Sequence, residues 1–441
     1  MLRLAMRLSA LLIIAVPLAA AAGQPNWVTS WAASVHGPYP IGNPSAQPNL
    51  SRVFPAAETG ARDQSFRLIV APGFWGKQAR VRFANTFGTQ PVTFDGAYAG
   101  LQWSGSAVMP GSNRAITFAG SKSVTIAPGA SVWSDAVTLP FVRNGQELRG
   151  RKLAVSFHVA GTSGPMTWHA KALQSSYVTL PGAGAKGDDV TEAAFPYATA
   201  SWYFLDALDM SAPRDLNAIV AFGDSITDGT ASTINGDDRW PDVLARRLNA
   251  HWVVVNAGIG GNQVIGPAEY TPQKPFPGGP AALQRLERDV LTLSGVKAVI
   301  WLEGTNDFSK NGNADAEAVI AGMREGVTRM RGRLPGVKVI GATLTSALGS
   351  TSAAHGFELQ DEKRKKLNEF IRTSGVFDGV ADFDRATTDA DTGGMRAEFV
   401  PDNTVGGHGD KLHPNRMGYQ AMGMVVDLTM FGPRAAAPRR R

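Results

Sequence analysis

The sequence predicts an all-β sandwich of jelly-roll type, followed by an α/β domain whose parallel sheet lies between two helical layers. The chain of 441 residues is longer than a single hydrophobic core usually allows. Its first part contains short alternating segments that are separated by turn residues, and from about residue 213 apolar runs alternate with helical patterns. We therefore expect a β-sandwich accessory domain over 25–212 and a second domain over 213–432.

The β sandwich is predicted from segments in which apolar and polar side chains alternate. These segments are 78–87, 91–100, 122–128 and 152–161. In the first of them, Val81 and Phe83 alternate with Arg80 and Arg82, which is the period of a strand with one buried face. Helical periodicity is hard to find before residue 213, so an all-β domain is favoured.

The α/β domain is predicted from apolar runs of strand length. They are 216–222, 252–257, 296–304, 336–344 and 377–383. Continuous apolar runs are expected where both faces of a parallel sheet are covered. Helical patterns lie between them, at 280–295, 315–333 and 358–374. In such a sheet the active site is expected at the carboxyl ends of the strands.

The amino terminus has the pattern of a secretory signal. Arg3 and Arg7 precede an apolar stretch of about ten residues, and small residues follow. We therefore expect a signal peptide over 1–22 and a secreted or periplasmic protein without a stable membrane span after its removal. At the other end, 433–441 is expected to be a basic, disordered tail.

Composition excludes several function classes. The net charge is +6, but Lys and Arg are scattered and no basic face with interleaved aromatic residues is found, so nucleic acid is not expected as a partner. Cysteine is absent, which excludes disulfides, thiolate catalysis and zinc held by cysteine.

The stretch "FGDSITDG" (222–229) follows the first apolar run and presents Ser225 as a candidate nucleophile. A serine hydroxyl is a poor nucleophile without a base to take its proton. The best base is His413 in "HGDKLHPNRMGY" (408–419), because Asp410 lies three residues before it and can fix its tautomer. His408 is the alternative base, but it lacks an acid at the same offset.

Two further loops contain candidate donors for an oxyanion. "NAGIGGNQV" (256–264) follows the second strand, and its glycines allow a backbone N–H to face the cleft. Gly261 is the preferred donor there, with Gly258 and Gly260 as alternatives. "LEGTNDF" (302–308) follows the third strand and supplies the side-chain amide of Asn306.

These four stretches, in this order, resemble the sequence blocks of the SGNH hydrolases, also called the GDSL esterase and lipase superfamily. The resemblance covers about residues 216–432, and Ile226 replaces the leucine of the family name. It implies a flavodoxin-like, three-layer domain, here of the branch with an N-terminal β domain. It also implies Ser225 as nucleophile, His413 as base and Asp410 as its partner. The N–H groups of Ser225 and Gly261 and the amide of Asn306 would form the oxyanion hole.

Other catalytic motifs are not found. In "GIGGNQ" Gln263 stands where a dinucleotide loop needs its third glycine, and no P-loop, H-E-x-x-H or G-x-S-x-G pattern occurs. Asp237 and Asp238 have no histidine near them in sequence. We therefore expect no cofactor and no metal.

The expected substrate is a short-chain acyl ester, acetyl above all, on a carbohydrate such as an acetylated polysaccharide. This expectation follows by analogy with family members. Long loops after the second and fifth strands hold Tyr270, Phe276 and Phe399, which could form an acyl or sugar pocket or could simply pack. Three alternatives stay open: a lipase or lysophospholipase, an acyltransferase, and a carbohydrate-binding surface protein with a vestigial hydrolase domain. The last would use exposed tryptophans among Trp27, Trp31, Trp103, Trp133, Trp168 and Trp202.

Overall fold

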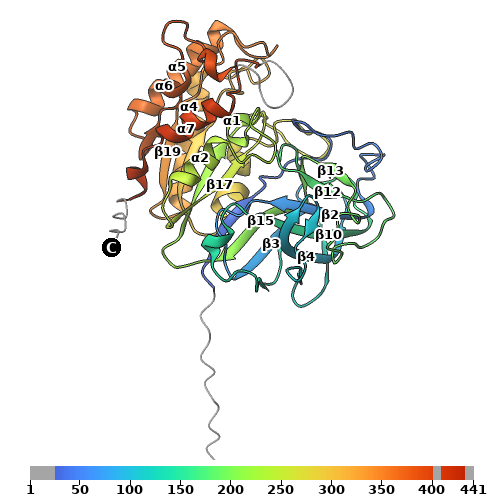
Figure 1. The fold of residues 1–441 in the computed structure, drawn as a ribbon. Coiled ribbons are helices and arrows are strands. Elements are labelled where there is room, and N and C mark those ends of the chain that lie inside the picture. The colour runs from blue at the N-terminus through green and yellow to red at the C-terminus, as the bar shows by residue number, and fades with distance from the viewer. Residues whose placement is uncertain (1–24, 401–408, 433–441) are drawn as a thin grey trace, which may run out of the picture.

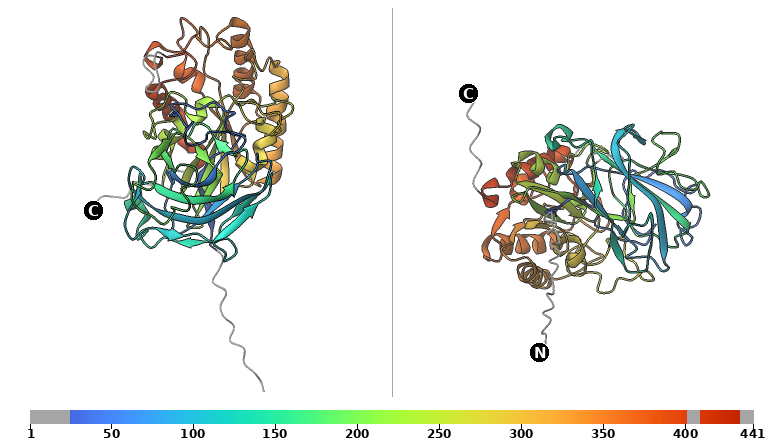
Figure 2. Two further views of the ribbon diagram at one scale, coloured as in Figure 1. Left: turned by 90° about the vertical axis from the view of Figure 1, so that its right-hand side faces the viewer. Right: turned by 90° about the horizontal axis from the view of Figure 1, so that it is seen from below.

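The computed structural model describes residues 25–400 and 409–432. The predicted signal peptide, the predicted basic tail and His408 lie outside these ranges. Figures 1 and 2 show a β-rich region beside a region in which helices flank a sheet. Within the described ranges, no helix has the length and apolar character needed to cross a membrane.

The β-rich region consists of antiparallel sheets. The first sheet contains β1 (Trp27–Ala32), β3 (Gln78–Ala84), β8 (Ser131–Trp133), β9 (Val137–Thr138) and β15 (Leu205–Ser211). The second contains β2 (Arg62–Val70), β4 (Val92–Ser104), β5 (Ala107–Val108), β6 (Arg114–Ala115), β7 (Ser123–Ile126), β10 (Leu153–Thr162), β12 (Ser176–Val178) and β13 (Tyr197–Thr199). A separate ladder pairs β11 (Trp168–His169) with β14 (Trp202–Tyr203).

Aromatic side chains join the two larger sheets. Phe83 on β3 meets Phe157 on β10 edge to face, with ring centroids 4.9 Å apart, and Phe157 stacks on Phe66 of β2 at 5.1 Å. All three rings are fully buried. Burial of such large apolar surfaces is the main stabilising contribution to a sandwich of this kind. The prediction of a β-rich N-terminal region is confirmed.

The tryptophans of this region do not share one exposed face. Trp31, Trp168 and Trp202 are buried in the core, and Trp103 is 60% exposed. Trp27 and Trp133 are half-buried and both contact the guanidinium of Arg80. These six side chains therefore do not form an aromatic surface for stacking on sugars. The alternative of a carbohydrate-binding surface protein would require such a surface.

The second region contains a parallel sheet of five strands. They are β16 (Asn217–Gly223), β17 (Trp252–Gly258), β18 (Val296–Leu302), β19 (Lys338–Ala342) and β20 (Gly379–Ala381). Their order is β17-β16-β18-β19-β20, and every neighbouring pair is parallel. Numbered within the domain, this is the 2-1-3-4-5 order of flavodoxin-like folds. The predicted α/β fold is confirmed, and all five strands lie within the predicted apolar runs or one residue beyond them.

Helices cover both faces of the sheet. One face packs against α2 (Trp240–Arg247), α6 (Phe383–Thr387) and α7 (Arg416–Val425). The other packs against α3 (Ala282–Leu286), α4 (Ala316–Arg333) and α5 (Glu358–Thr373). The single helix predicted over 280–295 is shorter in the structure, because α3 passes into one π-helical turn, η2 (Glu287–Leu291).

The β-rich region packs directly against the α/β region. Val28 of β1 and Ala207 of β15 belong to the same apolar core as Val253 and Val255 of β17. Hydrogen bonds accompany this packing, since Thr29 N–H donates to the carbonyl of Ser294 at 3.0 Å. A further hydrogen bond, from the Asn43 side chain to the carbonyl of Gly260, places part of the β-rich region beside the carboxyl end of β17.

Candidate active site

Ser225 lies where β16 ends and the short helix α1 (Ser225–Asp228) begins. Asp224 caps this helix, because its side chain accepts a hydrogen bond from Ile226 N–H at 3.0 Å. Ser225 is the first helical residue, where the backbone N–H has no acceptor within the helix. Burial, together with repulsion from Glu303 and Asp307, raises the pKa of Asp224 to about 8. Asp224 therefore supports the turn on which Ser225 lies by capping α1.

The structure brings Ser225, His413 and Asp410 together. Ser225 Oγ lies 2.8 Å from His413 Nε2, and His413 Nδ1 lies 2.7 Å from Asp410 Oδ2. The other carboxylate oxygen of Asp410 accepts backbone N–H groups from Leu412 and His413 at 2.9 and 2.8 Å. Burial alone would raise the pKa of Asp410, but these hydrogen bonds and the charge of His413 hold it well below its usual range. Asp410 is thus ionised beside the imidazole.

The loop after β17 presents the backbone N–H of Gly261 as a donor for a ligand. Gly258 N–H donates to Asn256 Oδ1 and Gly260 N–H donates to Asp228 Oδ2, both at 2.9 Å. Gly261 N–H has no acceptor within the part of the chain that the structure describes, and Gly261 lines the cleft. Its φ of +87° also requires glycine. Among the three glycines considered from the sequence, Gly261 alone has a free N–H at the cleft.

Asn306 reaches the same cleft from the loop after β18. Its side-chain amide donates one hydrogen bond to the carbonyl of Asn262 at 2.9 Å, which leaves a second N–H. The neighbouring Asp307 fixes the two loops together, because its carboxylate accepts N–H groups from Val264 and Ile265 at 2.8 and 3.1 Å. Burial raises the pKa of Asp307 to about 7.

A buried arginine connects the loops beneath the site. Arg285 of α3 is fully buried and donates to the carbonyls of Gly223 and Ala257, each at 2.8 Å. It also donates to Asn262 Oδ1 at 2.6 Å and pairs with Asp289 at 2.9 Å. Because Gly223 ends β16 and Ala257 lies near the end of β17, this one guanidinium holds both strand ends in register with each other. No motif in the sequence indicates this role.

These residues surround a cleft of about 350 Å³. Most of the residues that line it carry polar or charged side chains. The lining residues are Asn43, Lys171, Ser225, Gly261, Gln263, Phe276, Pro277, Gly278, Asn306, Ser309, Asn311, Ser352, Ala354, His355, Asp410, Leu412 and His413. Of the three aromatic residues considered from the sequence, Phe276 lines the cleft, whereas Tyr270 packs against Phe87 and Phe399 is buried near α7.

A second histidine, His355, also lines the cleft. Gln360 of α5 donates to His355 Nδ1 at 2.8 Å and to the carbonyl of Thr305 at 3.1 Å. Burial, and then the charge of His413, lowers the pKa of His355 to about 4, so this histidine is neutral near pH 7 with its proton on Nε2.

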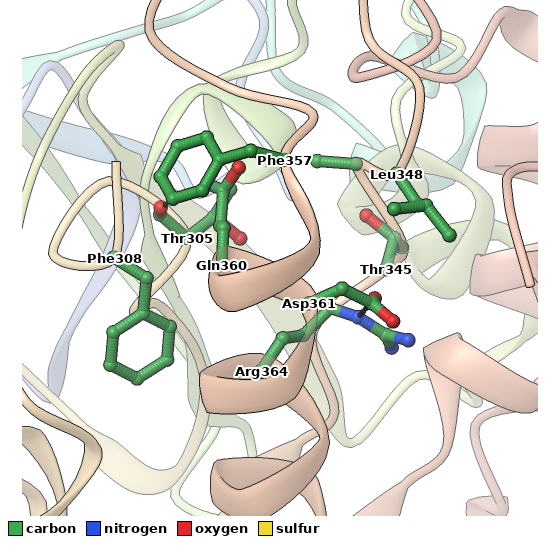
Figure 3. Close-up of a pocket in the computed structure, with 9 residues that line it drawn as sticks. Thr305, Phe308, Thr345, Leu348, Phe357, Gln360, Asp361 and Arg364 are labelled. Carbon is green, nitrogen blue, oxygen red and sulfur yellow. Dashed lines mark hydrogen bonds and ion pairs between the residues drawn. The ribbon is translucent and has the colours of Figure 1, made fainter. Parts of the chain in front are cut away.

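A separate, small pocket is also lined by Gln360, and Figure 3 shows Gln360 beside Thr305 there. This pocket measures about 10 Å³, room for about one water, and is too small for a substrate.

Two cleft residues, Asn43 and Lys171, come from the β-rich region. Asn43 lies between β1 and β2 and donates to the carbonyl of Gly260 at 2.7 Å. Lys171 follows β11 and donates to Thr230 Oγ1. Burial lowers the pKa of Lys171, and Asp228, Asp224 and Asp410 oppose this shift. The sequence motifs include neither residue.

No cluster of metal ligands is found in the described ranges, since no three His, Asp or Glu side chains gather there in a suitable arrangement. The site brings together a serine, a histidine, a carboxylate and neutral N–H donors at the carboxyl ends of parallel strands. Such an arrangement can carry out acyl transfer through a serine nucleophile.

Comparison with known proteins agrees with this class. Residues 221–421, which lie within the α/β region, match the GDSL-like lipase/acylhydrolase family. The search of curated proteins found no match to the chain.

Several solved structures resemble the chain over about half of its length. A carbohydrate acetylesterase family member from Sinorhizobium meliloti is 17% identical, with a TM-score of 0.38, over 49% of this chain and 100% of its own. The native aryl esterase of M. smegmatis is 19% identical, with a TM-score of 0.37, over 47% of this chain and 95% of its own.

Proposed function

We propose that this protein is an exported serine esterase that hydrolyses short-chain acyl esters, acetyl above all, on carbohydrate. The observation that carries the proposal is the continuous hydrogen-bonded chain from Ser225 through His413 to Asp410, which opens onto a cleft with unused N–H donors. The family match supports an acylhydrolase. The signal-like pattern of the first residues supports export.

The reaction follows from the positions of these groups. His413 Nε2 accepts the proton of Ser225 Oγ while the oxygen attacks the acyl carbonyl, and Asp410 stabilises the resulting imidazolium. The carbonyl oxygen becomes an oxyanion, for which Gly261 N–H, Ser225 N–H and the Asn306 amide supply hydrogen bonds. His413 then returns the proton to the leaving alkoxide, and an acyl-serine remains. A water molecule, deprotonated by His413, attacks this ester, and the acid and free serine are released.

The lining of the cleft favours a small acyl group on a polar alcohol. Only four of its lining residues have apolar side chains, namely Phe276, Pro277, Ala354 and Leu412, which is a small set for binding a long alkyl chain. Amide and hydroxyl groups of Asn43, Gln263, Asn311 and Ser352 predominate, and such groups hydrogen-bond the hydroxyls of a sugar.

The proposal is tested by the release of acid from a panel of esters. Acetylated xylan, acetylated pectin and simple acetyl, butyryl and dodecanoyl esters are compared, with the Ser225→Ala variant as the blank for each. We expect serine-dependent release that is fastest from acetyl esters and occurs on at least one polysaccharide. Preference for the dodecanoyl ester would replace the proposal with a lipase. Formation of a new ester in preference to free acid, when an alcohol acceptor is added, would replace it with an acyltransferase.

The Asn306→Ala variant tests the oxyanion role of this amide. We expect kcat on an acetyl ester to fall by about 10² to 10³, because one donor to the developing charge is lost. KM should change little, since the amide contributes mainly in the transition state. Steady-state kinetics on p-nitrophenyl acetate separate the two constants. A rise in KM at unchanged kcat would show that Asn306 binds the ground state and the transition state equally, which would contradict the oxyanion role.

A further inference from the structure

The peptide group between Gly260 and Gly261 is held through its carbonyl by the β-rich region. Its carbonyl accepts a hydrogen bond from Asn43 Nδ2 of the β-rich region at 2.7 Å. A trans peptide is planar, and its C=O and N–H point in opposite directions. Whatever fixes the Gly260 carbonyl therefore also fixes the direction of Gly261 N–H, the free donor at the cleft.

The preceding N–H is fixed as well. Gly260 N–H donates to Asp228 Oδ2 at 2.9 Å, and Asp228 is the last residue of α1, the helix that begins with Ser225. The other carboxylate oxygen of Asp228 lies 3.2 Å from His169 Nε2 of β11 in the β-rich region. Both residues of this pair are almost fully buried. Thus Asp228 joins the nucleophile helix to the glycine loop, and His169 contacts Asp228 from the β-rich side.

The β-rich region also lies against the two glycines themselves. A β-carbon built on Gly260 would come 2.9 Å from Lys171 Nζ, and one built on Gly261 would come 2.5 Å from Asn43 Nδ2. Without Asn43, the Gly260 carbonyl would lose the one side-chain donor that the structure gives it, and a glycine pair is the part of a chain that most readily changes its backbone angles. The loop would then sample orientations in which Gly261 N–H does not face the oxyanion.

We propose that the β-rich region completes the oxyanion hole of the α/β region, with Asn43 as a positioning residue that orients Gly261 N–H. This inference rests on the proposed function, since it assigns the N–H to an oxyanion. The β-rich region is then a part of the catalytic unit. It is required for full esterase activity whether or not it binds carbohydrate on its own.

The test compares Asn43→Ala and Asn43→Asp with wild type on p-nitrophenyl acetate. Aspartate keeps the shape of asparagine, but in its ionised form it can only accept hydrogen bonds. It therefore cannot donate to the Gly260 carbonyl. We expect both variants to lose about 10- to 30-fold in kcat, less than the loss of a direct donor, with KM within about threefold. A trifluoromethyl ketone, which forms a tetrahedral adduct with serine, should bind more weakly by the same factor as kcat/KM falls.

Gln47→Ala is the matched control on the same segment. Gln47 hydrogen-bonds Thr199 and Ala200 inside the β-rich region and does not line the cleft. It should keep the kcat of wild type even if its melting temperature falls. The inference is overturned if the Asn43 variants keep kcat within twofold of wild type, or if Gln47→Ala loses as much kcat as they do. Absence of Ser225-dependent turnover in wild type would instead overturn the proposed function, and this inference with it.

Discussion

Replacing Ser225 with alanine is expected to lower kcat on acetyl esters by about 10⁴ to 10⁶, with the folded structure retained. The substitution removes the Oγ that lies 2.8 Å from His413 Nε2, so no acyl-enzyme can form. The effect on folding should be small, because only a hydroxyl is removed and its one hydrogen bond, to His413, contributes about 1 kcal/mol. Activity is followed by p-nitrophenol release, and folding by circular dichroism.

Ser134→Ala is the control for this variant. Ser134 is also buried, and its hydroxyl accepts a hydrogen bond from Val81 N–H at 3.0 Å within the β-rich region, away from the cleft. It should show full activity and a small loss of stability. If Ser225→Ala retained more than about a tenth of wild-type kcat, a residual far above that of serine hydrolases without their nucleophile, Ser225 would not be the nucleophile.

The second large effect is expected for Asp410→Asn, which should lower kcat by about 10⁴ near pH 7. Asparagine has nearly the same shape as aspartate, but its amide can donate to His413 Nδ1 and so stabilise the tautomer with the proton on Nε2. That tautomer cannot accept the proton of Ser225 Oγ. The backbone N–H groups of Leu412 and His413 still find an acceptor in the amide oxygen, so the loop should keep its shape.

The same substitution at Asp427 is the control. Asp427 is exposed and caps a short helical turn by accepting Thr429 N–H at 2.9 Å, and it does not line the cleft. Asp427→Asn should leave kcat unchanged. A fall of less than about tenfold for Asp410→Asn would contradict the assigned orientation of His413, because such a fall could come from a small displacement of the ring alone.

The sequence predicts the fold well where its signal is local. Each strand of the parallel sheet is a continuous apolar run, since both faces are covered, and these runs can be recognised without knowledge of their neighbours. The short motifs at the strand ends led to Ser225 and His413, which are 188 residues apart and lie in hydrogen-bond contact in the structure. The motifs could be joined because the carboxyl ends of parallel strands meet at one edge.

Other parts of the site depend on packing between distant segments. Asn43 lies in a segment without regular secondary structure, and only the docking of the β-rich region brings it to Gly260. Arg285 lies within the helical pattern predicted over 280–295 and belongs to none of the catalytic motifs. It is fully buried because two strand-end carbonyls and Asp289 provide acceptors for it. Neither set of partners can be read from the sequence around the residue.

The central claim is that Ser225 becomes acylated, and covalent trapping tests it most directly. Wild-type protein and the Ser225→Ala variant are treated with a fluorophosphonate, which phosphonylates an activated serine, then digested and examined by tandem mass spectrometry. We expect a single phosphonyl adduct on the peptide that contains Ser225, loss of esterase activity in proportion to labelling, and no adduct in the variant. An adduct on a different serine, or full esterase activity after complete labelling of Ser225, would contradict the assignment.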